Sequence, residues 1–151
     1  MFFRGVNPIN LDAKGRMAIP ARYRDRLSEH CGGQMVATID TEERCLLLYP
    51  LAEWEEIEAK IEALPSFKPA VRRIQRLLIG HATDIDMDGN GRLLLPATLR
   101  DYAGLSKKII LLGQGSKFEI WSEEHWMATR EEYLAEADAA ELPDELQNLS
   151  L

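Results

Sequence analysis

Two arginines, Arg16 and Arg92, each follow a glycine and lie four residues after an aspartate. An arginine side chain presents a planar fork of N–H donors that suits phosphate oxygens or the O6 and N7 acceptors of guanine. A glycine can reverse the chain at low steric cost, so the arginine beside it would leave a rigid turn. The pattern therefore indicates either recognition of nucleic acid or an arginine–aspartate pair that only locks the turn.

The two motifs belong to a longer internal repeat. Residues 10–25 have the sequence NLDAKGRMAIPARYRD, and residues 86–101, at an offset of 76, have DMDGNGRLLLPATLRD. Seven of the sixteen positions are identical, namely Asp12/Asp88, Gly15/Gly91, Arg16/Arg92, Pro20/Pro96, Ala21/Ala97, Arg24/Arg100 and Asp25/Asp101. A duplicated unit builds a pseudo-two-fold object that presents the same groups twice. Because Gly15 and Gly91 must each turn the chain, we expect both to have positive φ.

The distribution of charge favours recognition of nucleic acid over an arginine–aspartate pair that only stabilises the turn. The net charge of −7 argues against such a partner, but residues 1–50 and 65–117, which contain the repeats, together carry +6. Residues 51–64 and 118–151 together carry −13. Because salt screens charges over about 10 Å, a locally basic face can act independently of the total charge. Lys14 and Arg4 add positive charge near the first copy.

Each turn is expected to join two strands, because apolar residues alternate around it. In the second copy, Leu93, Leu94 and Leu95 form a continuous apolar run, which predicts an arm buried on both faces. Pro20 and Pro96 are then expected in the first turn of a short helix, where the missing N–H is tolerated. A glycine ends each of these helices.

Each copy continues with a hairpin and an acidic helix. Pairs of apolar runs flank polar turns, which predicts two β-hairpins, from residues 35–39 with 45–49 and from 109–112 with 118–121. Helices are expected at residues 51–64, 68–79 and 123–140. The tail from about Glu141 is acidic and poor in aromatic residues, as is typical of a mobile segment. The expected domains are repeat 1 at 6–53, connecting helices at 54–81, repeat 2 at 82–125, and a C-terminal helix with an acidic tail at 126–151.

Other chemistries have weaker support. Residues 86–91 imitate the opening of a calcium loop, but the twelfth position, which should be glutamate, is Ala97. The segment at 113–115 lacks the rest of a phosphate-loop fingerprint. The histidines are scattered, and no nucleophile lies in an activating motif. We therefore expect no catalytic residue, metal ligand or cofactor, and Cys31 and Cys45 are expected to be reduced thiols.

The expected location is the cytoplasm. No apolar run approaches the roughly 20 residues that a spanning helix needs. The first residues, with a charge at Arg4 and a turn expected at Asn7 and Pro8, lack the apolar centre of a signal peptide.

The sequence resembles the MraZ family of bacterial regulators associated with the division and cell-wall gene cluster. The resemblance runs over residues 1–151 and includes DAKGR at 12–16, DMDGNGR at 86–92, CLLLYPLAEWE at 45–55 and RLLIGHA at 76–82. It implies an α+β fold in which two tandem AbrB-like swapped-hairpin elements close into a double-split β-barrel with flanking helices. It also implies a ring-shaped homo-oligomer, nucleoid association, and repression of its own promoter and the adjacent gene cluster. The partner would be double-stranded DNA bearing short direct repeats.

The resemblance also implies roles for particular residues. It assigns DNA contacts to four residues at the two turns, namely Lys14, Arg16, Asn90 and Arg92, and turn formation to Asp12, Gly15, Asp88 and Gly91. The second copy departs from the family pattern, because Asn90 replaces the lysine. Two other classes stay open: an AbrB-type antitoxin that binds a toxin, and an interaction scaffold without DNA affinity. The in-chain duplication argues against the antitoxin, and no membrane or small-molecule partner is expected.

Overall fold

The computed structural model describes residues 2–137 and 143–149 of the 151-residue chain. Its elements are β1 (Phe3–Asn10), β2 (Arg16–Ala18), α1 (Ala21–Cys31), β3 (Gln34–Ile39), β4 (Leu46–Pro50), α2 (Leu51–Glu62), α3 (Pro69–Ile74), the π-helix η1 (Gln75–Ile79), β5 (Thr83–Asp86), β6 (Arg92–Leu94), α4 (Ala97–Ala103), β7 (Lys108–Gly115), β8 (Lys117–Ser122), α5 (Glu123–Ala137) and α6 (Asp144–Gln147). None of these helices combines the length and the apolar character needed to cross a membrane.

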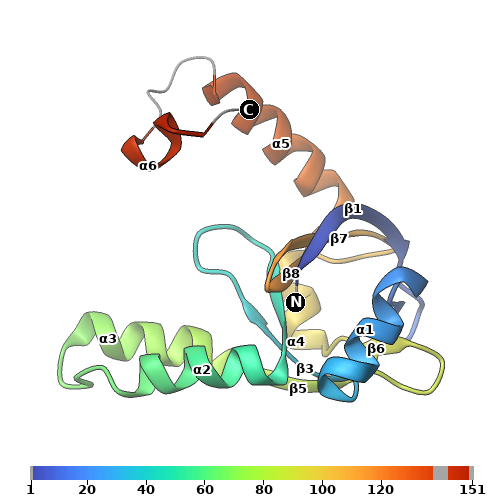
Figure 1. Ribbon diagram of the computed structural model, residues 1–151, viewed down its shortest axis with the longest axis horizontal. Coiled ribbons are helices and arrows are strands. Elements are labelled where there is room, and N and C mark those ends of the chain that lie inside the picture. The colour runs from blue at the N-terminus through green and yellow to red at the C-terminus, as the bar shows by residue number, and fades with distance from the viewer. Residues whose placement is uncertain (1, 138–142, 150–151) are drawn as a thin grey trace.

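The two repeats exchange strands. Six strands form an antiparallel sheet in the order β1-β7-β8-β4-β3-β5 (Figure 1). The first strand of each repeat pairs with the other repeat, because β1 pairs with β7 and β5 pairs with β3. The strands β4 and β8 meet between the two halves, and β2 pairs with β6 in a separate two-stranded ribbon. The pseudo-two-fold arrangement expected from the duplication therefore extends to the strand pairing.

The α+β class is confirmed, but the strands do not close into a hydrogen-bonded barrel. The six-stranded sheet is open, with β1 and β5 as its edge strands. The ribbon strands are only three residues long and pair with each other rather than with those edges. The expectation of a closed barrel is therefore wrong at the level of the hydrogen-bonded ladder.

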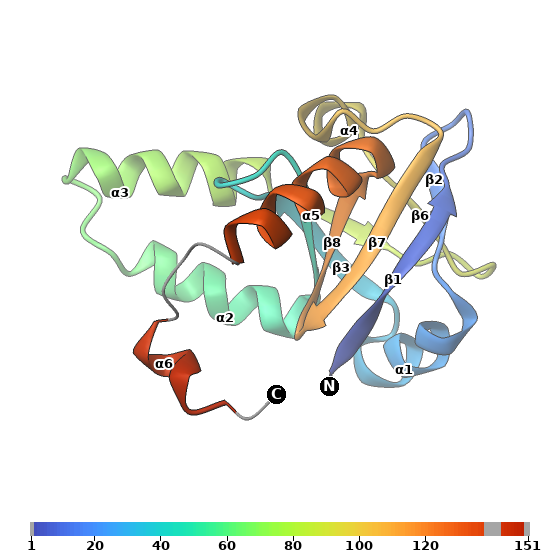
Figure 2. The same ribbon diagram turned by 90° about the horizontal axis from the view of Figure 1, so that it is seen from above.

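The six-stranded sheet separates two layers of other elements (Figure 2). On one face, the ribbon and the helices α1 and α4 enclose the main core, to which Met17, Tyr23, Leu93 and Leu99 belong. On the other face, Trp54 of α2 contacts Tyr49, while α5 lies across the sheet and places Trp126 against Trp121. The hairpin of α2 and α3 extends from the end of the molecule opposite the ribbon. The ribbon is thus anchored on the main core and free of the helical arm.

Several local expectations are confirmed and others are corrected. The glycines Gly32 and Gly104 end α1 and α4 in left-handed conformation, with φ of 62° at each. Pro20 and Pro96 are N-cap residues with extended ψ angles, so each helix begins one residue later than expected. The helix expected at 68–79 is divided into α3 and η1. The last residues of the helix expected at 123–140 lie outside the described residues, and the tail contains the one-turn helix α6.

The run of three leucines does not make an arm buried on both faces. Leu93 and Leu95 have no exposed surface, but Leu94 is 57% exposed. The reason is the strand period of two, which turns the middle leucine away from the core. An exposed leucine on a short strand is therefore a feature of the ribbon's outer surface.

Candidate nucleic-acid interface

One aspartate organises each turn of the ribbon. Asp12 Oδ1 accepts the backbone N–H groups of Lys14 and Arg16 at 2.9 and 2.8 Å. The backbone N–H of Gly15 donates to the carbonyl of Asp12 at 3.0 Å. In the second turn, Asp88 makes the equivalent side-chain bonds at 2.8 and 2.9 Å. These bonds satisfy the turn's amides and fix where the following arginine leaves the backbone.

The two turn glycines have positive φ, as the sequence predicted. The values are 87° for Gly15 and 74° for Gly91. Each glycine is also covered by an arginine of the opposite repeat, so a Cβ at Gly15 would lie 2.8 Å from Nε of Arg100. A Cβ at Gly91 would lie 2.6 Å from Nε of Arg24. Both turns therefore require glycine for their backbone conformation and for the space beside it.

Arg24 and Arg100 are structural residues that the sequence interpretation did not single out. Arg24 Nε donates to the carbonyl of Ile19 at 2.6 Å, and Arg100 Nε donates to the carbonyl of Leu95 at 3.0 Å. Each tethers its helix to the end of the strand before it and packs on the other repeat's turn. The signal that could have identified them was their identity in both copies.

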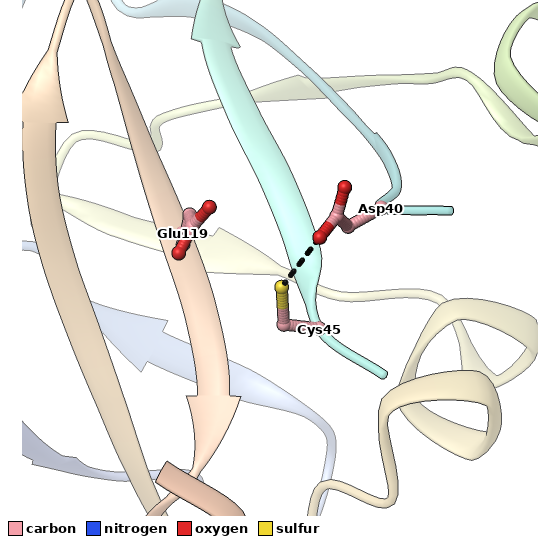
Figure 3. Close-up of side chains that lie close together, drawn as sticks. All are labelled: Asp40, Cys45 and Glu119. Atoms are coloured by element: carbon pink, nitrogen blue, oxygen red, sulfur yellow. Dashed lines mark hydrogen bonds between the residues drawn. The ribbon is translucent and has the colours of Figure 1, made fainter. Parts of the chain in front are cut away.

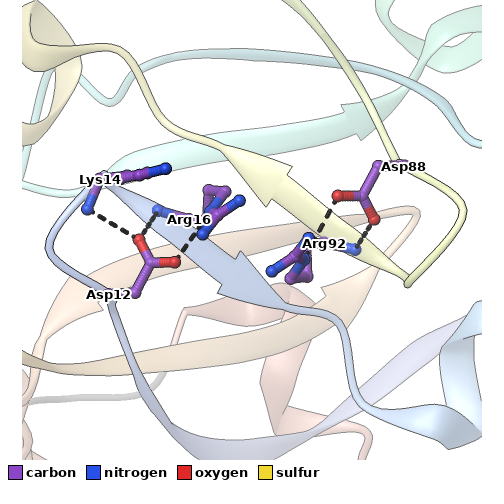
Figure 4. Close-up of polar contacts among 5 residues, drawn as sticks. All are labelled: Asp12, Lys14, Arg16, Asp88 and Arg92. Atoms are coloured by element: carbon purple, nitrogen blue, oxygen red, sulfur yellow. Dashed lines mark hydrogen bonds and ion pairs between the residues drawn. The ribbon is translucent and has the colours of Figure 1, made fainter.

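The ribbon has one buried face and one outer face. Met17 and Leu93 lie opposite each other and have no exposed surface. Arg16 lies opposite Leu94, and Arg92 lies opposite Ala18, so both arginines leave the outer face. They are diagonal neighbours, a relation that places residues about 7–8 Å apart. Figure 4 shows the two guanidinium groups between the two aspartates.

Each arginine is bound to its own aspartate through one nitrogen. Arg16 Nε donates to Asp12 Oδ2 at 2.8 Å, and Arg92 Nε donates to Asp88 Oδ2 at 3.3 Å (Figure 4). The arginine side chains are 31% and 34% exposed. Among the described residues, none accepts a hydrogen bond from the Nη atoms of either arginine. The arginine–aspartate pair that stabilises each turn is therefore present, and it leaves the terminal N–H groups of the arginine available to a ligand.

The aspartates stay charged over the ordinary pH range. The backbone N–H of Arg16 is the largest cause that lowers the pKa of Asp12, and its guanidinium adds to the effect. Asp88 has a lowered pKa for the same reason, with Arg92 as its partner. A lowered pKa in the folded state stabilises the fold above the unfolded value, near pH 4, and this stabilisation is lost as the pH falls through the folded pKa.

The other two candidate contacts lie at the tips of the turns. Lys14 and Asn90 are exposed and precede their arginines by two residues. Because β2 and β6 are antiparallel, the two tips lie at opposite ends of the ribbon. The structure thus brings Arg16 and Arg92 together at the centre of one face and separates Lys14 from Asn90.

Comparison with known proteins agrees with the internal repeat. The family model described as "MraZ protein, putative antitoxin-like" matches the chain twice, at residues 2–77 and 78–148. The chain belongs to the MraZ family. It is 59% identical over 151 residues to the transcriptional regulator MraZ of Halorhodospira halophila (strain DSM 244 / SL1), with 99% of each chain covered. It is 57% identical to that of Coxiella burnetii (strain RSA 493 / Nine Mile phase I), again with 99% of each covered. The resemblance inferred from the sequence motifs is therefore confirmed.

Proposed function

We propose that this protein is a transcriptional regulator that binds DNA sequence-specifically through the β2–β6 ribbon. The major groove of B-DNA is wide enough to admit a two-stranded β-ribbon. The observation that carries the proposal is that Arg16 and Arg92 share the outer face of a ribbon whose inner face is fully buried. A ribbon anchored in this way presents its side chains to a ligand without having to fold on binding.

The geometry of the arginines suits base recognition. Asp12 and Asp88 hold the Nε edges, so each guanidinium is oriented before DNA arrives. The terminal nitrogens can then donate to O6 and N7 of guanine, the commonest specific contact in the major groove. The exposed Leu94 beside Arg16 offers an apolar contact of the kind that a thymine methyl group makes.

The wider proposal follows the family and the names of its relatives, which are called transcriptional regulators. It is a non-enzymatic, cytoplasmic and nucleoid-associated repressor of its own promoter and the adjacent division and cell-wall genes. One ribbon with few contacts would bind weakly at physiological salt. A ring-shaped homo-oligomer that engages several direct repeats would raise the avidity without new contacts. The exchanged strands and the ribbon would correspond to the AbrB-like, double-split arrangement of such regulators.

An electrophoretic mobility shift with the protein's own upstream DNA, at several salt concentrations, tests the proposal. A specific shift that outlasts competition by unrelated DNA supports the regulator. Binding only to a co-purified toxin would instead identify an antitoxin, a class to which the family description also refers. If no shift occurs even at low salt, the protein would instead be an interaction scaffold without DNA affinity.

Lys14→Ala should lower affinity for all DNA sequences alike. Lys14 is exposed at the tip of the first turn, where it suits a phosphate rather than a base edge. Each lost phosphate contact should flatten the slope of log K against log salt by about 0.9. The matched control is Lys60→Ala, which removes the same charge from α2, on the arm opposite the ribbon. A selective loss for one sequence, with an unchanged salt slope, would assign Lys14 to a base instead.

The purified protein should form a closed oligomer well above a dimer. The stretches that contain the repeats carry +6 and the remainder −13, so complementary surfaces exist for head-to-tail contacts that close into rings. Light scattering at micromolar concentration and physiological salt measures the mass. Arg16→Ala should have the same mass, because the proposal places Arg16 on the DNA side. A monomer under these conditions would contradict the avidity argument.

A further inference from the structure

A thiol and two carboxylates meet on the sheet face that α5 covers. Asp40 follows β3, Cys45 precedes β4, and Glu119 lies on β8 beside it (Figure 3). One ligand-type atom from each of the three lies within 4.8 Å of the other two. Cys45 has no exposed surface, and its Sγ lies 3.7 Å from Oδ2 of Asp40. Sequence spacing gave no sign of this cluster, because the pairing of β4 with β8 assembles it.

The two carboxylates are already oriented by other groups. Trp121 Nε1 donates to Oε1 of Glu119 at 3.0 Å. The backbone N–H groups of Thr41 and Glu43 donate to the two oxygens of Asp40 at 3.0 and 3.3 Å. Outer hydrogen bonds of this kind orient the carboxylate ligands of metal ions.

The cluster has an excess of negative charge. Among the described residues, no lysine or arginine forms an ion pair with Asp40, Glu43 or Glu119. A cation at this point would offset the mutual repulsion of these carboxylates.

The imidazole of His125 lies beside Glu43, a residue of the loop between β3 and β4. Nε2 of His125 makes no hydrogen bond with any residue in 2–137 or 143–149, and the side chain as a whole is 38% exposed. This nitrogen lies 3.7 Å from Oε2 of Glu43, whose other oxygen accepts the hydroxyl of Tyr133 at 3.1 Å. A neutral imidazole nitrogen is a common zinc ligand, so the Glu43–His125 pair adds ligand-type atoms beside the loop that carries Asp40 and Cys45.

We propose that Asp40, Cys45 and Glu119 bind a divalent metal ion of the zinc class, with the adjoining Glu43–His125 pair supplying the fourth ligand. Zinc lies about 2.3 Å from thiolate sulfur and about 2.1 Å from carboxylate oxygen, so tetrahedral geometry separates the two ligand atoms by about 3.6 Å. The Cys45 thiol donates a hydrogen bond to Asp40 Oδ2 at 3.7 Å, a separation close to this value, so an ion could take the place of the thiol proton. A mixed set of sulfur, oxygen and nitrogen favours zinc over magnesium or calcium. The ion would join the β3–β4 loop and β8, and a ligand from His125 would add α5.

Cobalt(II), a spectroscopic substitute for zinc, provides the test. Titration of the untagged, full-length protein should produce a thiolate-to-cobalt charge-transfer band that saturates at one ion per chain and disappears when Zn²⁺ is added. Cys45→Ser should abolish the band. Cys31→Ser is the control, because Cys31 is the other free thiol and donates to the carbonyl of Leu27, outside the cluster.

A second variant keeps the test valid if Cys45→Ser does not fold. Glu119→Gln preserves an acceptor for Trp121 but removes the charge, and should weaken cobalt binding by at least about tenfold, the lower end for loss of an outer-shell partner. Circular dichroism would verify that its fold is intact. The proposal is overturned if wild type gives no thiolate band, if Cys45→Ser retains the band, or if folded Glu119→Gln binds cobalt as tightly as wild type.

Discussion

Arg16→Ala should weaken binding to operator DNA by about 1–3 kcal/mol for each subunit engaged, if the arginine contacts a base edge. The variant should still fold, because Asp12 retains its bonds to the backbone N–H groups of the turn. It should also lose discrimination between operator and mismatched DNA, whereas its binding to unrelated DNA changes less. Titrated mobility shifts with both DNAs measure this ratio directly.

Two further variants separate the loss of a specific contact from the loss of charge. Arg130→Ala removes one positive charge from α5, where the side chain pairs only weakly with Glu131 at 3.4 Å, and should bind as wild type does. Arg92→Ala tests whether the second copy, which has Asn90 in place of lysine, contributes to binding. Wild-type affinity and specificity in folded, oligomeric Arg16→Ala would refute the role proposed for the ribbon.

The parts of the site that depend on local sequence could be predicted. The turns follow from Asp12, Gly15 and their equivalents, because an aspartate that accepts nearby amides and a glycine with positive φ need only neighbouring residues. The helix ends at Gly32 and Gly104 follow from equally local chemistry. The pseudo-two-fold relation of the two similar motifs could also be predicted, because duplication within one chain brings pseudo-symmetry.

The parts that depend on distant residues could not be predicted. The packing of Arg24 on the other repeat's turn requires the exchange of strands between repeats. Leu94 belongs to an apolar run in which the strand period of two separates it from Leu93 and Leu95, but only the packing of the ribbon on the core shows which face is outward. The cluster of Asp40, Cys45 and Glu119 likewise requires the pairing of β4 with β8. Pattern and spacing carry no information about such long-range contacts.

Gly91→Ala should lower the free energy of unfolding by about 2–4 kcal/mol. A left-handed backbone costs a residue with a Cβ about 1–2 kcal/mol, and the glycine has a φ of 74°. The new Cβ would lie 2.6 Å from Nε and 2.7 Å from Cδ of Arg24, which must move. The hydrogen bond that Arg24 donates to the carbonyl of Ile19, worth about 1 kcal/mol, would be weakened. Urea unfolding at fixed protein concentration measures the change.

Gly89→Ala is the matched control within the same turn. Gly89 lacks positive φ, an added Cβ there meets nothing within 4 Å, and the first copy already has Ala13 at the equivalent position. Its unfolding free energy should therefore stay within about 0.5 kcal/mol of wild type.

Gly104→Ala, with a φ of 62° and equally open space, isolates the cost of the backbone. Because Arg24 belongs to α1 of the first repeat, the loss at Gly91 beyond that at Gly104 measures the cost of displacing this side chain from the turn of the second repeat. Equal stabilities for Gly91→Ala and Gly104→Ala would mean that the Arg24 side chain moves away from the new Cβ at no cost in free energy. The turns would then be stabilised by their aspartates alone.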